Sequence, residues 1–178
     1  MNKLVIFIQG AGGYQADAKL AASLRAALGE EYEVRYPQML STGTLPDFGW
    51  PEQIGKEISC IQGEAILIGH SLGASMLLKY LTEYDVKKEI AGIFLISAPF
   101  WTGDEDWKEG LKLQENFADE LPANVPVFFY HCRDDEEVPF AHLGLYKQKL
   151  PRATFREIAS GGHQLNNDLT IVAKDIIL

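Results

Sequence analysis

Short apolar runs alternate along the chain with segments in which apolar residues recur every three or four positions. Most of these runs are nearly continuous in Val, Ile, Leu and Phe, a pattern typical of parallel strands that are covered on both faces. We therefore expect six strands, at Lys3–Gln9, Tyr32–Tyr36, Ala65–Gly69, Ile90–Ser97, Val125–His131 and Thr154–Ile158.

Between the runs, the apolar spacing changes to the period of an α-helix. Pro51 is a helix start signal and Gly29 a stop signal. The expected helices are Asp17–Leu28, Pro51–Ile61, Ser71–Tyr84 and Leu165–Ile176. No repeat or linker interrupts this alternation, so residues 1–178 are expected to form one α/β domain with a doubly wound, mainly parallel sheet and helices on both faces. In such sheets, ligands bind beyond the carboxyl ends of the strands.

The segment after the third expected strand reads Gly69-His70-Ser71-Leu72-Gly73 and matches the pattern G-x-S-x-G. In that pattern a sharp strand-to-helix turn exposes the serine hydroxyl, and the glycines remove Cβ atoms that would clash. Ser71 is therefore the candidate nucleophile. The alternative is that Ser71 only caps the helix that follows.

Four acidic residues, Asp134 to Glu137, follow the fifth expected strand. A serine nucleophile needs a base, and the base needs an acid that holds its tautomer. Any one of these carboxylates can supply that acid. The alternative for each is a solvated side chain ahead of a helix N-terminus, where negative charge is favourable.

His163 follows two glycines after the sixth expected strand. The glycines allow close backbone approach, and the chain order Ser, Asp, His is the order that a hydrolase triad on post-strand loops requires. His163 is therefore the candidate base. The other three histidines, His70, His131 and His142, are expected to be structural.

The first expected strand ends in a glycine-rich loop that begins Gly10-Ala11-Gly12-Gly13. A tetrahedral acyl intermediate carries an oxyanion that two backbone N–H groups stabilise, and Ala11 and Leu72 are the candidate donors. A dinucleotide fingerprint is disfavoured because Gln15 stands where its third glycine belongs. A plain flexible loop is the remaining alternative.

Together these four segments resemble the α/β-hydrolase superfamily, and in particular its small serine hydrolases of the retinoblastoma-binding protein nine type. The resemblance covers nearly the whole chain. Its D-x-x-V-P pattern falls on Asp135, Val138 and Pro139, which implies Asp135 as the triad acid with Asp134 as the alternate. It also implies the strand order 2-1-3-4-5-6. Where the family commonly has His-Gly after the first strand, this chain has Gln9-Gly10.

Aromatic residues supply a candidate acyl pocket. The long connection over residues 98–123 contains several of them, and the length leaves no room for a separate cap domain. The candidate pocket residues are Tyr14, Trp50, Phe100 and Trp101, with Met39 and Phe140 as possible additions. For each, the alternative is a place in the core.

Composition limits the partners. The chain has 16 Lys and Arg against 25 Asp and Glu, which disfavours nucleic acid. Residues 104–120 and 133–137 carry most of the negative charge, and this acidic rim is expected to repel anionic substrates. Two cysteines without a CxxC motif predict neither a zinc site nor a disulfide framework, although one disulfide stays open. The run Leu4–Ile8 is too short for a membrane span, and the expected location is the cytoplasm.

These observations predict a serine hydrolase without metal or cofactor that cleaves a small neutral acyl substrate through an acyl-enzyme. The triad would be Ser71, His163 and Asp135. A second hypothesis is a binding or regulatory protein on the same scaffold with weak or no catalysis. A third is acyl transfer or cofactor-free haloperoxidase chemistry on the same triad. The oligomeric state is not predicted.

Overall fold

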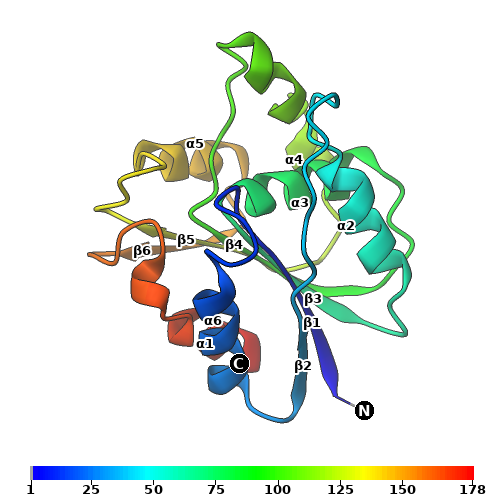
Figure 1. The fold of residues 1–178 in the computed structure, drawn as a ribbon, viewed down its shortest axis with the longest axis vertical. Coiled ribbons are helices and arrows are strands. Elements are labelled where there is room, and N and C mark those ends of the chain that lie inside the picture. Colours follow the sequence, from blue (N-terminus) through cyan, green and yellow to red (C-terminus); the bar gives the residue numbers. More distant parts are fainter. Residues whose placement is uncertain (1) are drawn as a thin grey trace.

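The computed structural model of the chain describes residues 2–178, apart from the side chain of Trp107, and is built on a six-stranded sheet (Figure 1). All strand pairs are parallel and the order is β2-β1-β3-β4-β5-β6, as expected. The strands are β1 Lys3–Ile8, β2 Tyr32–Arg35, β3 Ala65–His70, β4 Ile90–Ile96, β5 Val127–Cys132 and β6 Thr154–Ile158. The largest difference from prediction is at β5, which begins two residues later than Val125.

Helices cover both faces of the sheet (Figure 1). One face carries α1 (Ala18–Leu28) and α6 (Thr170–Ile177), and the other carries α2 (Trp50–Ser59), α3 (Leu72–Glu83) and α5 (Ala141–Lys149). Successive side chains of a strand point to opposite faces, and β1 divides accordingly. Val5 and Phe7 pack toward α1 and α6, whereas Ile6 and Ile8 pack toward α2 and α3. The continuous apolar run Leu4–Ile8 is thus explained by a sheet with two buried faces.

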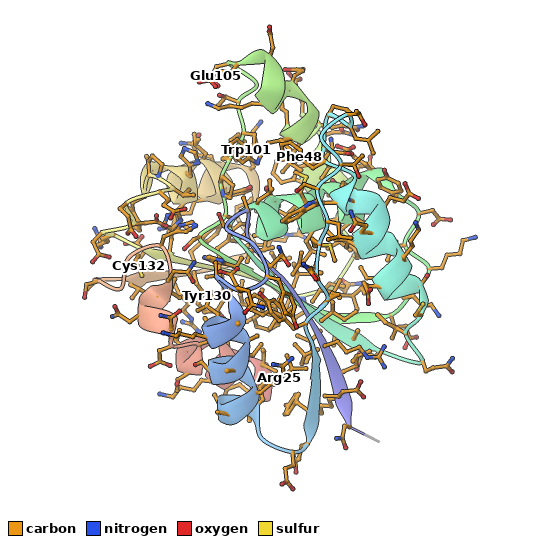
Figure 2. The ribbon with its side chains drawn as sticks, in the orientation of Figure 1. Arg25, Phe48, Trp101, Glu105, Tyr130 and Cys132 are labelled. Atoms are coloured by element: carbon orange, nitrogen blue, oxygen red, sulfur yellow. The ribbon has the colours of Figure 1, made fainter. Side chains whose placement is uncertain are left out.

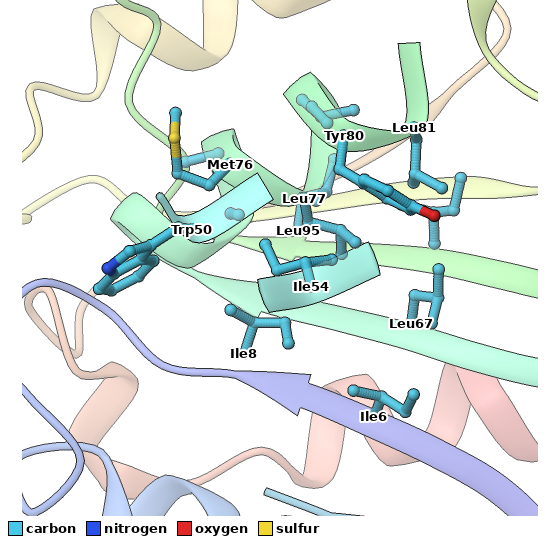
Figure 3. Close-up of a cluster of buried hydrophobic side chains, with 14 of the residues drawn as sticks. Ile6, Ile8, Trp50, Ile54, Leu67, Met76, Leu77, Tyr80, Leu81 and Leu95 are labelled. Atoms are coloured by element: carbon cyan, nitrogen blue, oxygen red, sulfur yellow. The ribbon is translucent and has the colours of Figure 1, made fainter. Parts of the chain in front are cut away.

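The larger core lies between the sheet and helices α2 and α3. Figure 3 shows Trp50 and Ile54 of α2 facing Leu77 of α3 and Ile8 of β1. All four side chains are 1% exposed or less. Burying one side chain of this size contributes about 1.5–3 kcal/mol, so this layer fixes α3 firmly against the carboxyl end of β3.

The helix predicted at Leu165–Ile176 is interrupted, and this prediction was wrong in its first half. Residues Leu165–Asn167 form a short 3₁₀ turn (η2), in which all three residues have positive φ, and α6 begins only at Thr170. Asn tolerates this left-handed backbone better than most residues. Asp168 then ends the turn, because its Oδ1 accepts hydrogen bonds from the backbone N–H and hydroxyl of Thr170.

The connection from β4 to β5 contains a 3₁₀ helix, η1 (Asp106–Leu111), and a single helical turn, α4 (Phe117–Glu120). It rises above α3 and α5 in Figure 1. Leu111 and Phe117 anchor it, since both are buried in the core on the α3 side. In the part of the chain that the structure describes, this connection carries no larger inserted unit.

Candidate active site

The four sequence segments of interest meet at one edge of the sheet, because each follows the carboxyl end of a parallel strand. The glycine-rich loop follows β1, Ser71 follows β3, the acidic loop follows β5 and His163 follows β6. In the sheet β1 is the neighbour of β3, and β5 is the neighbour of β6. The strand order therefore pairs the glycine-rich loop with Ser71 and the acidic loop with His163.

Ser71 occupies a strained turn. Its backbone has φ 52° and ψ −123°, a region that L-residues rarely adopt, and its N–H donates to the carbonyl of Ile96 at 2.8 Å. The flanking glycines make the turn possible. A Cβ on Gly69 would lie 2.5 Å from the Cα of Ala74, and one on Gly73 would lie 2.1 Å from the carbonyl oxygen of Gln9.

The loop after β1 packs directly on this turn. A Cβ on Gly10 would lie 3.1 Å from the Cβ of Ser71. Within residues 2–178, no hydrogen bond uses the Ala11 N–H, and Leu72 is the first residue of α3, where backbone N–H groups lack helical partners. The loop is not a loose one, since the Gly10 N–H donates to Asp17 and the Gly13 N–H to the Gly10 carbonyl.

Asp135 is the carboxylate that contacts His163. Its side chain is 0% exposed, and each carboxylate oxygen lies 3.0 Å from His163 Nδ1. Oδ1 also accepts the backbone N–H groups of Glu137 and Val138, and Oδ2 lies 3.2 Å from His131 Nε2. Burial raises the pKa of Asp135, but the hydrogen bonds from His131, His163 and the backbone outweigh it, so the pKa falls well below its usual range.

Two further carboxylates hold the backbone that carries His163. Gly161 and Gly162 have φ of 149° and 64°, and their N–H groups donate to the Asp134 carboxylate. The N–H of His163 donates to Oε2 of Glu136 at 3.0 Å. The acidic loop therefore holds this turn in place. Each of its first three carboxylates binds a different group of the turn: glycine N–H groups, the His163 ring or the His163 N–H.

His163 is buried, at 2% exposed, and its pKa is raised. Burial lowers that pKa, but the hydrogen bond and charge of Asp135 and the charges of Glu137 and Glu136 raise it further. Nε2 lies 3.4 Å from Oε2 of Glu137. Within the described residues no hydrogen bond joins Ser71 Oγ to Nε2. Such bonds are commonly long in a ligand-free site and shorten when substrate binds.

The other histidines all have partners. His131 contacts Asp135 and the Val138 carbonyl, and His142 Nδ1 accepts the N–H of Phe100 at 2.9 Å. Burial lowers the pKa of His142. His70 lies 2.7 Å from Asp17. The sequence reasoning missed Asp17, because an acidic residue directly before a helix is indistinguishable from an ordinary N-cap.

The four candidate pocket residues are not in one place. Phe100 and Trp101 line a cavity of about 230 Å³ together with Leu113 and Phe117. Trp101 donates from Nε1 to Ser75 Oγ at 3.0 Å, one helical turn beyond Ser71, and Figure 2 shows it where the long connection leaves the sheet.

Tyr14 and Trp50 do not line this cavity. Tyr14 stacks on Tyr36 at a ring distance of 4.4 Å, on the α1 side of the sheet. Trp50 is buried at the start of α2, with Nε1 donating to Ser41. Met39 is also buried in that core, and Phe140 packs edge-on against His131.

No group of three or more His, Cys, Asp or Glu side chains within residues 2–178 is arranged to hold a metal ion. No helix in the same range is long and apolar enough to cross a membrane. Cys60 is exposed, Cys132 is buried, and both thiols are free.

Comparison with known proteins agrees with this geometry. A family model described as serine hydrolase matches residues 17–169, whereas no curated protein matches the sequence. Similar solved structures include the thioesterase domain from the curacin biosynthetic pathway (TM-score 0.74, 16% identity, 99% of this chain and 92% of that chain). Another is the ydeN gene product from B. subtilis, with a TM-score of 0.73 and 20% identity over 99% of this chain and 97% of that chain. A third is a carboxylesterase structure from the ammonia-oxidizing thaumarchaeon Nitrososphaera gargenis, with a TM-score of 0.73 and 15% identity over 99% of this chain and 88% of that chain.

At these identities the structural likeness shows the fold, and the family match shows the family. The match spans well over half of the chain, and it includes Ser71, Asp135 and His163. The chain therefore belongs to the serine hydrolase family and has the α/β-hydrolase fold.

Proposed function

We propose that the protein hydrolyses small neutral acyl substrates, esters first, with Ser71 as nucleophile, His163 as base and Asp135 as the acid that orients His163. One observation carries this proposal. The buried Asp135 carboxylate engages His163 Nδ1 with both oxygens at 3.0 Å, and this leaves Nε2 as the nitrogen that is available to a substrate or a serine hydroxyl.

The proposed reaction follows from these contacts. His163 Nε2 accepts the hydroxyl proton of Ser71 while Oγ bonds to the acyl carbon, and the N–H groups of Ala11 and Leu72 stabilise the oxyanion. The imidazolium then gives the proton to the leaving group. A water molecule attacks the acyl-enzyme in the second half, with His163 again as base, and releases the acid and free Ser71.

The apolar cavity at Phe100 and Trp101 is our candidate for the acyl or alkyl pocket. The proposed triad does not line it, but Trp101 contacts Ser75, one helical turn beyond Ser71. The cavity volume of about 230 Å³ is small beside the roughly 300–1,000 Å³ of sites that enclose drug-sized ligands. We therefore favour short acyl chains over long lipids. Lys112, Lys149 and Glu115 also line the cavity, and their mixed signs favour no charged group.

The first test is the Ser71→Ala variant. Wild-type protein is expected to turn over p-nitrophenyl acetate and to react covalently with a fluorophosphonate probe, and the variant is expected to do neither while keeping the same circular dichroism spectrum. Loss of a triad nucleophile costs about 10⁶-fold in turnover. Labelling that persists in Ser71→Ala would contradict the proposal.

The acid is tested by two matched amide substitutions. Asp135→Asn is expected to lower kcat by about 10³–10⁴-fold, because an amide no longer holds the productive tautomer of His163. Asp134→Asn removes the charge but keeps an oxygen that can accept the Gly161 and Gly162 N–H groups, so we expect a loss of about tenfold or less. Steady-state kinetics on the same ester separates the two, and equal small losses would show that the acid lies elsewhere.

One observation favours a second candidate, a binding protein with a vestigial triad. Among the described residues Ser71 Oγ makes no hydrogen bond to His163, and Glu137 lies beside Nε2 instead. Wild-type turnover no faster than that of Ser71→Ala would select this alternative.

A further inference from the structure

Asp17 and His70 are two buried polar residues that the proposed reaction does not use. Each is 1% exposed. Asp17 precedes α1, but its side chain makes no hydrogen bond to cap the helix. Its Oδ2 instead accepts the Gly10 N–H at 2.7 Å and lies 2.7 Å from His70 Nδ1, and its Oδ1 accepts Nε2 of Gln164 at 3.1 Å. One carboxylate thus joins the loop after β1, the Ser71 turn and the His163 loop.

The other ring nitrogen of His70 reaches the backbone of the proposed base. His70 Nε2 lies 3.0 Å from the carbonyl oxygen of His163, and Ser97 Oγ donates to the same oxygen at 3.2 Å. A carboxylate and a carbonyl both only accept hydrogen bonds. The two contacts are therefore hydrogen bonds together only when both ring nitrogens of His70 carry a hydrogen.

We propose that Asp17 and His70 form a positioning pair that fixes the glycine-rich loop and the His163 loop against the Ser71 turn. This inference rests on the function proposed above. Through Asp17 the pair holds Gly10, the neighbour of the oxyanion donor Ala11. Through Nε2 of His70 it holds His163 at its main chain.

The loops need such contacts because glycine restricts the backbone less than any other residue. Gly161 and Gly162, directly before His163, and Gly13 all have positive φ. The amino side of the His163 turn is already held by Asp134 and Glu136 from the acidic loop. The contact with His70 fixes the distance between that turn and Ser71, which the acidic loop does not fix.

Packing alone does not explain this pair. A buried ion pair is commonly no more stabilising than apolar side chains of similar volume. This pair lies instead where three strand-end segments meet. His70 directly precedes Ser71, and three contacts of the pair lead to the loop after β1 and to the His163 loop. Displacement of a reacting group by about 1 Å is enough to cost about 100-fold in rate.

Substitutions at His70 separate the two arms of the pair. His70→Ala removes both contacts, His70→Gln keeps an amide donor near the Nε2 position, and His70→Asn keeps one near the Nδ1 position. For His70→Ala and for Asp17→Asn we expect kcat on p-nitrophenyl acetate to fall about 10–100-fold, with KM unchanged within about threefold. His70→Gln and His70→Asn are each expected to recover part of the loss. Should His70→Ala not fold, these two variants and Asp17→Asn carry the test.

The control is Tyr130→Phe, which removes a hydrogen bond to Asp175 of 2.7 Å in the core on the α1 and α6 side. It is expected to lower thermal stability and leave kcat unchanged. An equal loss of kcat in Tyr130→Phe, or unchanged kcat in His70→Ala, would overturn the positioning role.

Hydrogen exchange gives a readout that does not depend on turnover. In His70→Ala and Asp17→Asn, peptides spanning residues 9–13 and 160–165 are expected to exchange at least about tenfold faster, while peptides from β3 and β4 are unchanged. Unaltered exchange in both loops would refute the pair even if wild-type protein proved inactive. Inactive wild-type protein with faster exchange in the variants would instead refute the proposed function and keep the pair.

Discussion

Glu137 differs from the other acidic residues of its loop because it lies beside the catalytic nitrogen of the proposed base. Asp134 and Glu136 bind backbone N–H groups, and Asp135 binds His163 Nδ1. Glu137 is 65% exposed at its side chain, and its Oε2 lies 3.4 Å from His163 Nε2. Its charge therefore stabilises the protonated imidazole, which is the form that cannot act as a base.

This contact predicts the direction of a pH effect. Because neutral His163 is the active form, kcat/KM rises with pH through the pKa of His163, and that pKa is raised above its ordinary value of about 6.5. Glu137→Gln removes one of the charges that raise it. We expect the midpoint of the acidic limb to move down by about 0.2–0.7 pH units, as measured with a neutral ester at low salt.

The control for this shift is Glu64→Gln, which removes one charge from an exposed position just before β3, at the opposite edge of the sheet. Its profile is expected to match the wild type. A midpoint that stays in place in Glu137→Gln, or that moves equally in both variants, would show that Glu137 does not act on His163.

For single residues, the sequence predicts contacts between side chains better than it predicts contacts between a side chain and the backbone. Asp135 and His163 were predicted to meet, and both carboxylate oxygens do contact Nδ1. The roles of Asp134 and Glu136 depend on which backbone N–H groups turn toward them, and that follows from positive φ at Gly161 and Gly162. A pattern of residue types does not contain this information.

The turn between β3 and α3 is the element on which the proposed site depends most closely. The N-terminus of α3 passes so near the end of β1 that a Cβ on Gly73 would lie 2.1 Å from Gln9 O and 2.7 Å from Ile8 O. Both of those atoms are backbone, so neither can move without shifting the strand. The close approach also brings the loop after β1 next to Ser71.

Two Gly→Ala substitutions in helices are expected to have opposite effects. Gly73→Ala creates an overlap with backbone and should lower the free energy of unfolding by about 1–3 kcal/mol or more, with loss of ester hydrolysis. Gly144→Ala lies within α5, where a Cβ meets nothing within 4 Å. It should raise stability by about 0.5–1 kcal/mol, because Ala is the better helix former.

Urea unfolding of both variants measures this contrast. Gly144→Ala also serves as the activity control, since the added Cβ meets nothing within 4 Å. Equal stability changes in the two variants would show that the approach of α3 to β1 tolerates a methyl group.

Element types are predicted well where burial on both faces determines the pattern. The six strands and the helices α1, α2 and α3 follow from apolar runs and from helical stripes, with Gly29 at the end of α1 and Pro51 in the first turn of α2. The prediction of a helix at Leu165–Ile176 was wrong in its first half. The helical spacing of Leu165, Leu169 and Val172 continues through residues that form a turn. All three of those side chains are buried, so the hydrophobic period is retained although the backbone is not helical.

On the scale of the whole molecule, the net charge of −9 is not spread evenly. Residues 104–120 and 133–137 hold eleven acids against three bases, and both follow strands at the edge that carries the proposed site. The structure refines the predicted acidic rim. Three of the four acids in the second stretch accept hydrogen bonds from the His163 loop, and the fourth, Glu137, lies 3.4 Å from His163 Nε2. In the first stretch Lys108 pairs with Asp104 and Glu105.

This arrangement predicts discrimination against anionic esters. A carboxylate at the end of the acyl chain of p-nitrophenyl succinate would approach the proposed site against the charge of Glu137 and the field of the whole chain. In water, the repulsion between two unit charges roughly 6–8 Å apart is about 0.5–0.7 kcal/mol. We expect kcat/KM to be about 2–10-fold lower than for p-nitrophenyl butyrate. The gap should narrow at 1 M salt, where the Debye length falls to about 3 Å, and also in Glu137→Gln at low salt. An anionic ester that is hydrolysed as fast as the neutral one at low salt would contradict this prediction and would point to Lys112 and Lys149, which line the cavity, as the groups that receive the carboxylate.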